Sequence, residues 1–268
     1  MMTRSYATIN GFDLAYSVHG DARRPVVVLS HALATSMELW GYQIPLLASH
    51  FRVVLYDLRG HGKSGTPGDV YTLAALASDV AGLLDHLKIP RASFVGLSIG
   101  GMVGQHLALQ FPDKVTALVL CSTGGRTEPE ARLTLGERID KVRSDGLKSQ
   151  LDATLARWFT PRFIEEAPET IAWVSQLILG TSIDGFVGCA RAVQGLDIIG
   201  SLGQVRARTL LIPGEFDLAF PEKVSRAIQQ KIPNADVVVL NGAAHIGNVE
   251  QAHRFNEILM HFLKGIPE

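Results

Sequence analysis

The chain has 268 residues, of which 47% are hydrophobic and 19% are charged. This composition is typical of a globular protein, and the length suits one large α/β domain with room for a small insertion. The 25 basic and 26 acidic residues give a net charge of −1, which excludes a strong electrostatic footprint for nucleic acid or an anionic membrane.

The chain begins with a predicted β-hairpin. Residues 6–9 and 12–16 alternate between apolar and polar, and the Asn10-Gly11 pair between them is a strong turn signal. Apolar runs that follow predict buried strands at residues 25–30, 51–56, 92–95, 115–121, 209–212 and 237–240. Apolar residues at helical spacing lie between several of these runs, as at residues 73–87, and again near the end of the chain at 255–262. The order predicts a mostly parallel sheet covered by helices on both faces.

The alternation of strands and helices stops between residues 122 and 205. No convincing strand pattern is present there, and helical stretches at 151–159, 171–179 and 185–196 are separated by Pro161, Pro168 and Gly180. We therefore expect residues 122–205 to form a helical cap over a core made of residues 1–121 and 206–268.

The strongest local signal is the G-x-S-x-G motif Gly96-Leu97-Ser98-Ile99-Gly100. It follows the predicted strand 92–95 and opens a helical stretch that ends before Pro112. In this strand–turn–helix context, a tight turn exposes the serine hydroxyl at a helix N-terminus, where negative charge is stabilised. The pattern predicts Ser98 as a nucleophile.

A serine hydroxyl needs a base to remove its proton, and in this motif's fold the acid and then the base follow the serine along the chain. His245 follows the predicted strand 237–240, and Asp217 follows the strand 209–212. Both positions are C-terminal strand ends, where open α/β sheets place their sites. We predict His245 as the base and Asp217 as the acid that orients it. Glu215 is the competing acid, and the spacing of the motif favours Asp217.

An acyl-transfer site also needs backbone donors for the oxyanion. In this fold one is the N–H of the residue after the nucleophile, and the other comes from the loop after an early strand. The first is Ile99. The loop after the strand 25–30 reads His31-Ala32-Leu33-Ala34-Thr35, and Leu33 is the predicted second donor.

Other motifs predict no metal and no cofactor. HExxH, CxxC and clustered carboxylates are absent from the sequence. Residues 57–64 lack the GxxxxGK[ST] spacing of a phosphate loop, so we interpret residues 57–64 as a strand-end turn.

Cys121 and Cys189 are expected to be reduced apolar residues. Residues 1–17 contain no apolar run of signal-peptide length, and no segment approaches the length of a membrane span, so we expect a cytoplasmic protein with no membrane partner.

These residues resemble those of the 3-oxoadipate enol-lactonase group of the α/β-hydrolase superfamily. The similarity covers nearly the whole chain and includes residues 55–62, 96–105 and 243–245, and in the predicted cap it includes 157–161 and 185–189. The resemblance implies the α/β-hydrolase fold, cofactor-free hydrolysis of a lactone, and a triad at Ser98, Asp217 and His245.

The loop at residues 31–35 departs from this resemblance. The enol-lactonase group usually has Asn-Ser-Leu-Gly-Thr there, whereas this chain has His-Ala-Leu-Ala-Thr, which is closer to generic esterases. The turn with Phe216 and Phe220 near Asp217 is also more aromatic than the resemblance implies. Both changes leave the triad intact and bear on the identity of the substrate.

The leading hypothesis is hydrolysis of a small lactone or carboxylic ester through an acyl-enzyme. Cofactor-free haloperoxidases or perhydrolases and carbon–carbon bond hydrolases use the same triad and are the alternatives. A ligand receptor that keeps the fold without catalysis is the hypothesis of a different class, and the complete Ser, Asp and His set argues against it. The expected partner is a small-molecule ester or lactone, not nucleic acid, and homo-oligomerisation is left open.

Three residues of the predicted cap are candidates for substrate binding. Trp158 belongs to the cap stretch most like the enol-lactonases, although a single Trp on a helix is also common in a packed core. Arg126 and Arg191 are candidates to bind a substrate carboxylate, because guanidinium groups pair with carboxylates through two parallel hydrogen bonds.

Overall fold

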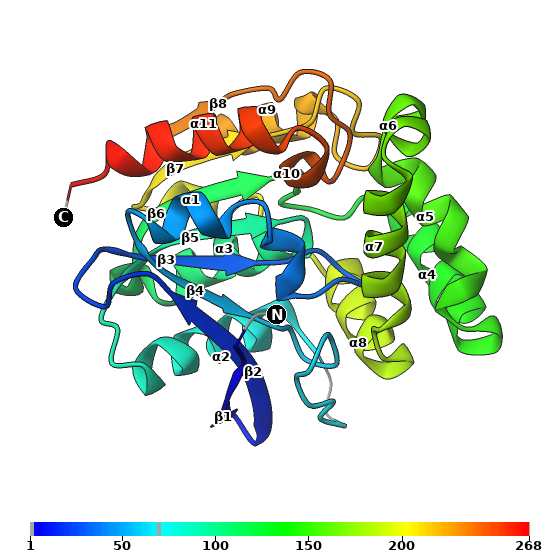
Figure 1. The fold of residues 1–268 in the computed structure, drawn as a ribbon, viewed down its shortest axis with the longest axis horizontal. Coiled ribbons are helices and arrows are strands. Elements are labelled where there is room, and N and C mark those ends of the chain that lie inside the picture. The colour runs from blue at the N-terminus through cyan, green and yellow to red at the C-terminus, as the bar shows by residue number, and fades with distance from the viewer. Residues whose placement is uncertain (1–2, 69–70, 268) are drawn as a thin grey trace.

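The computed structural model describes residues 3–68 and 71–267 (Figure 1). Its strands form a single eight-stranded sheet in the order β1-β2-β4-β3-β5-β6-β7-β8. β1 and β2 are antiparallel to each other, β2 is antiparallel to β4, and the remaining neighbours are parallel. The strands are β1 Ser5–Ile9, β2 Phe12–His19, β3 Val26–Ser30, β4 Arg52–Tyr56, β5 Ala92–Leu97, β6 Val115–Cys121, β7 Arg208–Ile212 and β8 Ala235–Val237. The predicted mostly parallel sheet is confirmed.

Helices cover both faces of the sheet (Figure 1). Alternate residues of one strand enter different hydrophobic clusters: Val53 and Leu55 of β4 pack in the cluster that contains α1 and α11, while Val54 packs with α2 and α3. The helices are α1 Ile44–Ala48, α2 Leu73–His86, α3 Ile99–Gln110, α4 Pro129–Asp145, α5 Leu151–Trp158, α6 Pro161–Glu166, α7 Pro168–Leu179, α8 Ile183–Gln194, α9 Glu222–Gln229, α10 Gly247–Glu250 and α11 Ala252–Lys264.

The N-terminal hairpin is confirmed together with its turn. Ile9 pairs with Phe12, and the two residues between them, Asn10 and Gly11, have φ of 47° and 85°. Positive φ at both central positions is the type I′ geometry that matches the twist of two antiparallel strands.

The last strand differs from the prediction. The apolar run at residues 237–240 predicts a strand there, but β8 covers Ala235–Val237, and Leu240 forms only an isolated bridge with Gly214. The neighbouring β7 is followed by Pro213, which has no N–H to donate. The regular ladder therefore ends before the apolar run does.

Between β6 and β7 the chain folds into helices α4 to α8. They lie together in Figure 1, beyond the C-terminal ends of the parallel strands. The α7–α8 connection contacts the core closely: the N–H and hydroxyl of Ser182 donate to the carbonyl oxygen of Gly60, and a Cβ on Gly185 would lie 2.3 Å from that oxygen. Only glycine allows the two backbones to approach this closely.

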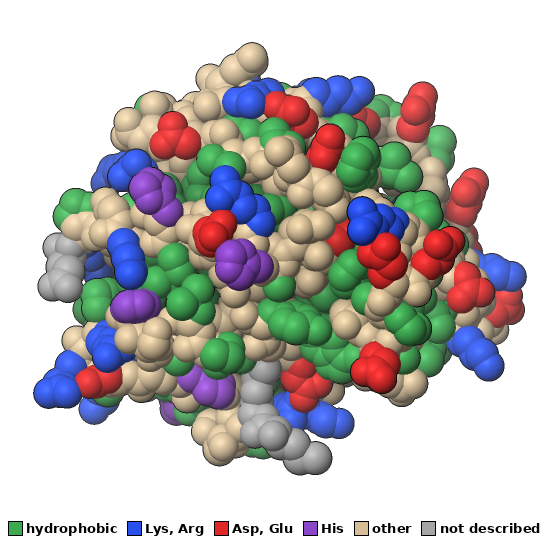
Figure 2. All heavy atoms as spheres, turned by 45° about the horizontal axis from the view of Figure 1, so that its top comes forward, with side chains coloured by type: hydrophobic (Ala, Val, Ile, Leu, Met, Phe, Trp, Pro, Cys, Tyr) green, Lys and Arg blue, Asp and Glu red, His purple; other side chains and the backbone are tan. Residues whose placement is uncertain are grey.

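Acidic and basic side chains are interspersed on the face of the molecule shown in Figure 2.

Among the described residues, no single helix is long and apolar enough to cross a membrane. The pair α7 and α8 together meets that test of length and composition, but the two helices are bent by 91° relative to each other.

Candidate active site

Ser98 lies on the turn between β5 and α3, with φ of 57° and ψ of −118°. Positive φ is uncommon for a residue with a side chain, and such strained backbone is concentrated at functional sites. Hydrogen bonds hold the turn on both sides, because the Ser98 N–H donates to Cys121 O (2.9 Å) and Thr123 Oγ1 donates to Ser98 O (2.7 Å). The ends of β5 and β6 therefore fix the direction of the serine.

The motif requires glycine at both of its glycine positions for steric reasons. A Cβ on Gly96 would lie 2.3 Å from the carbonyl oxygen of Gly100, and a Cβ on Gly100 would lie 2.3 Å from that of Ser30. Glycine at both positions lets the turn close on itself and lets α3 begin directly against the end of β3. The loop that follows Ser30 is thereby placed beside Ser98.

Asp217 and His245 meet at the C-terminal ends of β7 and β8. Asp217 Oδ2 lies 2.9 Å from Nδ1 of His245, and both side chains are at most 4% exposed. Burial alone would raise the pKa of Asp217, but the charge and hydrogen bond of His245 and the N–H groups of Phe220 and Ala219 outweigh it and lower this pKa. The competing acid, Glu215, is exposed and accepts from Gly242 N instead.

A cavity of about 680 Å³ brings the predicted residues together. Its lining includes Ser98, His245, Leu33 and Ile99 from the core, and Trp158 and Arg126 from the segment between β6 and β7. This volume is within the range of small-molecule sites, roughly 300–1,000 Å³. Two aromatic rings stack on the imidazole of His245: Trp158 at 6.3 Å and Phe220 at 5.8 Å between ring centroids.

Two buried histidines support the loop that carries Leu33. Nε2 of His61 accepts the N–H of Ala34 (3.1 Å), and Nε2 of His31 accepts the N–H of Leu58 (3.0 Å). Their Nδ1 atoms lie 2.8–2.9 Å from carbonyl oxygens and must donate, so both rings are neutral. Ala34 has φ of 60°, at the position where the enol-lactonase group usually has glycine, and the His61 contact helps to hold this strained residue.

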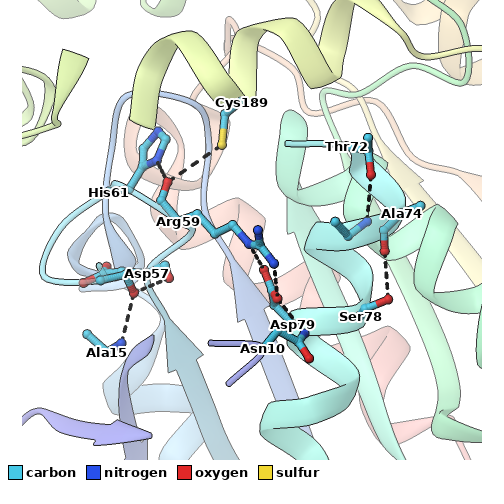
Figure 3. A network of polar contacts seen from close by, with 12 residues as sticks. Asn10, Ala15, Asp57, Arg59, His61, Thr72, Ala74, Ser78, Asp79 and Cys189 are labelled. Atoms are coloured by element: carbon cyan, nitrogen blue, oxygen red, sulfur yellow. Dashed lines mark hydrogen bonds and ion pairs between the residues drawn. The ribbon is translucent and has the colours of Figure 1, made fainter. Parts of the chain in front are cut away.

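A polar network lies beside these histidines (Figure 3). The Asp57 carboxylate accepts the N–H groups of Met37 and Lys63. The buried side chain of Arg59 pairs with Asp79 at 2.5 Å, as Figure 3 shows. The carbonyl oxygen of Arg59 faces both His61 and Cys189 of α8. Residues 57–64 are thus the structured turn that the sequence predicts, and both cysteines are free and buried.

The buried histidines predict an acid-sensitive fold. Burial lowers the pKa of His31 to about 3 and that of His61 to about 4, whereas both titrate near 6.5 once unfolded. Below pH 6.5 the unfolded chain therefore binds two more protons, while the buried Asp57, with its pKa raised to about 6, offsets one of them. We expect the free energy of unfolding to fall by on the order of 1 kcal/mol per pH unit from pH 6 to 4.

Urea unfolding at pH 4.5, 5.5 and 6.5 measures this slope. His61→Gln keeps a donor and an acceptor but removes one titrating ring, so its slope should be close to zero. A wild-type stability that does not change over this range would contradict the predicted protonation states.

The arginines at the cavity match those that the sequence indicates only in part, because Arg126 lines the cavity and Arg191 does not. Arg191 is exposed on α8 and does not line the cavity, and Arg126 lies at its rim, half exposed and paired with Asp197. Arg138 of α4 and Arg157 of α5, which the sequence did not single out, also line the cavity. Burial, together with the charge of Arg157, lowers the pKa of Arg138 to about 10, and burial also lowers that of Arg157.

Arg138 and Arg157 have unused hydrogen-bonding capacity. Among the described residues, neither forms an ion pair with an acid. Nε of Arg138 is buried without a hydrogen-bond partner, and its guanidinium lies 5.9 Å from the ring of Phe186. Arg157 has only a 3.4 Å contact to Thr154. The acid that lines the cavity, Glu128, is ten residues before Arg138, or about 15 Å along α4. The sequence predicted a cationic group in the cap but did not single out Arg138, because α4 has charged residues on all sides.

The chain is similar to several known hydrolases. The chain is 34% identical to 3-oxoadipate enol-lactonase 2 of Acinetobacter baylyi, over 96% of each chain. It superposes on the crystal structure of the enol-lactonase from Burkholderia xenovorans LB400 with a TM-score of 0.93 and 36% identity, covering 97% of this chain and all of the other. An esterase from Thermogutta terrifontis, in a malate-bound structure, gives a TM-score of 0.91 at 29% identity over 98% of each chain. Residues 25–252 match the alpha/beta hydrolase fold family, to which the chain belongs.

Proposed function

We propose that this protein hydrolyses a small lactone or carboxylic ester through an acyl-enzyme formed on Ser98. The observation that carries the proposal is a single cavity lined by Ser98, on its strained turn, and by His245, which is hydrogen-bonded to the buried Asp217. A nucleophile, a base and a group that orients the base are the parts that acyl transfer requires. The enol-lactonases and the esterase among its relatives support the same reaction class.

The proposed reaction begins when Nε2 of His245 takes the proton of Ser98 as Oγ bonds to the carbonyl carbon. The oxyanion that forms is held by the N–H groups of Leu33 and Ile99, and each such donor contributes on the order of 10² to 10³ in rate. The carbon–oxygen bond of the ester then breaks, and His245 gives its proton to the leaving oxygen. Water, deprotonated by His245, attacks the acyl-enzyme and releases the acid and Ser98.

We further propose that the substrate carries a carboxylate and that Arg138 and Arg157 bind it. Both side chains are partly buried without an acid, and a carboxylate between them would supply the missing acceptor. We keep Trp158 as a residue that contacts substrate, because it lines the cavity next to His245. Residues 122–205 are the proposed cap, which contributes these three side chains to a site whose reacting groups come from the core.

A substrate screen tests this proposal. We expect wild-type protein to hydrolyse 3-oxoadipate enol-lactone, or another lactone with a free carboxylate, faster than a neutral ester of similar size. A fluorophosphonate should label Ser98. Protein that hydrolyses no ester or lactone and is not labelled would overturn the proposed function, and faster turnover with peroxide than with water would favour a perhydrolase.

Replacing Arg138 or Arg157 with glutamine should raise KM for the carboxylate-bearing lactone about 10- to 100-fold, since hydrogen bonds to charged groups contribute roughly 1.5–3 kcal/mol. The neutral ester should keep its KM and kcat, which controls for damage to the triad. Arg191→Gln is the matched variant outside the cavity and should leave both substrates unaffected. Equal losses on both substrates, or none on either, would remove the two arginines from the substrate site.

A further inference from the structure

The backbone on either side of His245 is held by hydrogen bonds to residues outside its loop. The N–H of Ile246 donates to the backbone oxygen of Trp158 (3.1 Å), and the N–H of Ala244 donates to Oε2 of Glu250 (2.7 Å). Trp158 is the last residue of α5, and its ring stacks on the imidazole. One of the two holding contacts thus comes directly from the helical segment between β6 and β7.

The second contact leads to the same segment through Glu250. Its other oxygen, Oε1, accepts both the N–H of Thr160 (2.9 Å) and the hydroxyl of Thr160 (2.5 Å). Thr160 is the N-cap of α6, two residues after Trp158, and its hydroxyl also accepts from Phe163 N. Glu250, at the end of α10, is 7% exposed. One buried carboxylate therefore joins the loop of His245 to residues 158–160.

We infer that Glu250 is a positioning residue, which fixes His245 by tying its loop to the segment that carries Trp158. The inference rests on the proposed function, in which His245 is the base. An imidazole that must reach both Ser98 and the leaving oxygen needs a defined position, because a displacement of about 1 Å from the productive geometry can cost on the order of 10²-fold in rate. The hydrogen bond to Asp217 restrains the ring itself, and Glu250 restrains the backbone from which that ring extends.

The chemistry of the contact requires a carboxylate. Both oxygens of Glu250 face backbone N–H groups, those of Thr160 and Ala244, and an ionised carboxyl accepts on both sides. A glutamine has one oxygen and one NH₂, so in either orientation its NH₂ faces a backbone N–H. Replacement by glutamine therefore preserves the size of the side chain while breaking one of the two connections.

Glu250→Gln should lower kcat for the neutral ester about tenfold and leave KM unchanged, because the substrate contacts remain. The second-order rate of Ser98 labelling by a fluorophosphonate should fall by the same factor. Thr160→Val removes one of the three hydrogen bonds to Glu250, together with the N-cap bond from Phe163 N, and should give a smaller loss of the same kind. Asp79→Asn is the matched control, since it changes another buried carboxylate, the partner of Arg59, and should lower stability while leaving kcat unchanged.

A double variant separates positioning from general destabilisation. In a His245→Ala background, Glu250→Gln should cause no further loss of the residual activity, since Glu250 acts through His245. All rates are compared at a temperature where circular dichroism shows each variant to be folded. Should Glu250→Gln not fold, Thr160→Val decides the question, and wild-type kcat in that variant overturns the inference.

The outcomes also distinguish this inference from the proposed function. Wild-type protein that neither hydrolyses esters nor reacts with the fluorophosphonate overturns both. Active wild-type protein with an equally active Glu250→Gln variant, or with an additional loss in the His245→Ala background, overturns only the positioning role.

Discussion

Ser98→Ala protein is expected to lose ester and lactone turnover by on the order of 10⁵- to 10⁶-fold, the scale observed when a triad nucleophile is removed. No other group would then form the acyl-enzyme, and the remaining oxyanion donors supply only residual catalysis. Stability should change little, because the substitution deletes one hydroxyl at the cavity wall and leaves no large void. Steady-state rates with the best substrate of the wild type, together with thermal unfolding of both proteins, measure the two effects.

Ser122→Ala is the matched control for this change. Ser122 is also a non-glycine residue with positive φ, it follows the neighbouring strand β6, and it does not line the cavity. Its activity should stay near that of the wild type. More than a few per cent of activity in pure Ser98→Ala protein would show that Ser98 is not the nucleophile.

Asp217→Asn should lower kcat by about 10⁴-fold, the magnitude known for this change in a Ser-His-Asp triad. Asp217 Oδ1 accepts the N–H groups of Ala219 and Phe220, while Oδ2 faces Nδ1 of His245. An asparagine that keeps its oxygen on the two N–H groups must point its NH₂ at Nδ1. Nδ1 then has to accept, the ring proton moves to Nε2, and the nitrogen that should take the proton of Ser98 is already protonated.

Glu215→Gln provides the comparison for the acid. Glu215 is exposed, and its carboxylate accepts only the N–H of Gly242 among its described contacts, so this change should alter kcat by less than a few-fold. The kcat values of the two variants, measured over a range of pH, decide between them. A large loss in Glu215→Gln with little effect in Asp217→Asn would make Glu215 the acid.

The parts of the fold that depend on local sequence were predictable. The hairpin followed from Asn10-Gly11, and the turn at Ser98 followed from small residues at fixed spacing after an apolar run. α4 was missed because only three of its 17 residues are buried, which leaves almost no apolar periodicity. The end of β8 was misplaced because it depends on Pro213, which belongs to the neighbouring strand connection.

The candidate site also contains residues that the sequence could locate and residues that it could not. Residues at strand ends, such as Asp217 and His245, could be located because a parallel sheet brings the carboxyl ends of its strands to one edge. Arg138 could not, because whether it faces the cavity depends on the rotation of α4, whose charges lie on several sides. Glu250 had no sequence signal at all, since its two partners lie 6 and 90 residues away.

The close backbone contact between Gly60 and Gly185 has a consequence for dynamics. Together with the hydrogen bonds of Ser182, it fixes the α7–α8 turn to the core, and the carboxylate of Glu250 fixes the start of α6. We therefore expect α6 to α8 not to swing as a lid, whose opening typically takes microseconds to milliseconds. Substrate exchange should instead pass the exposed side chain of Leu218 at the cavity wall, by local motions on the nanosecond scale.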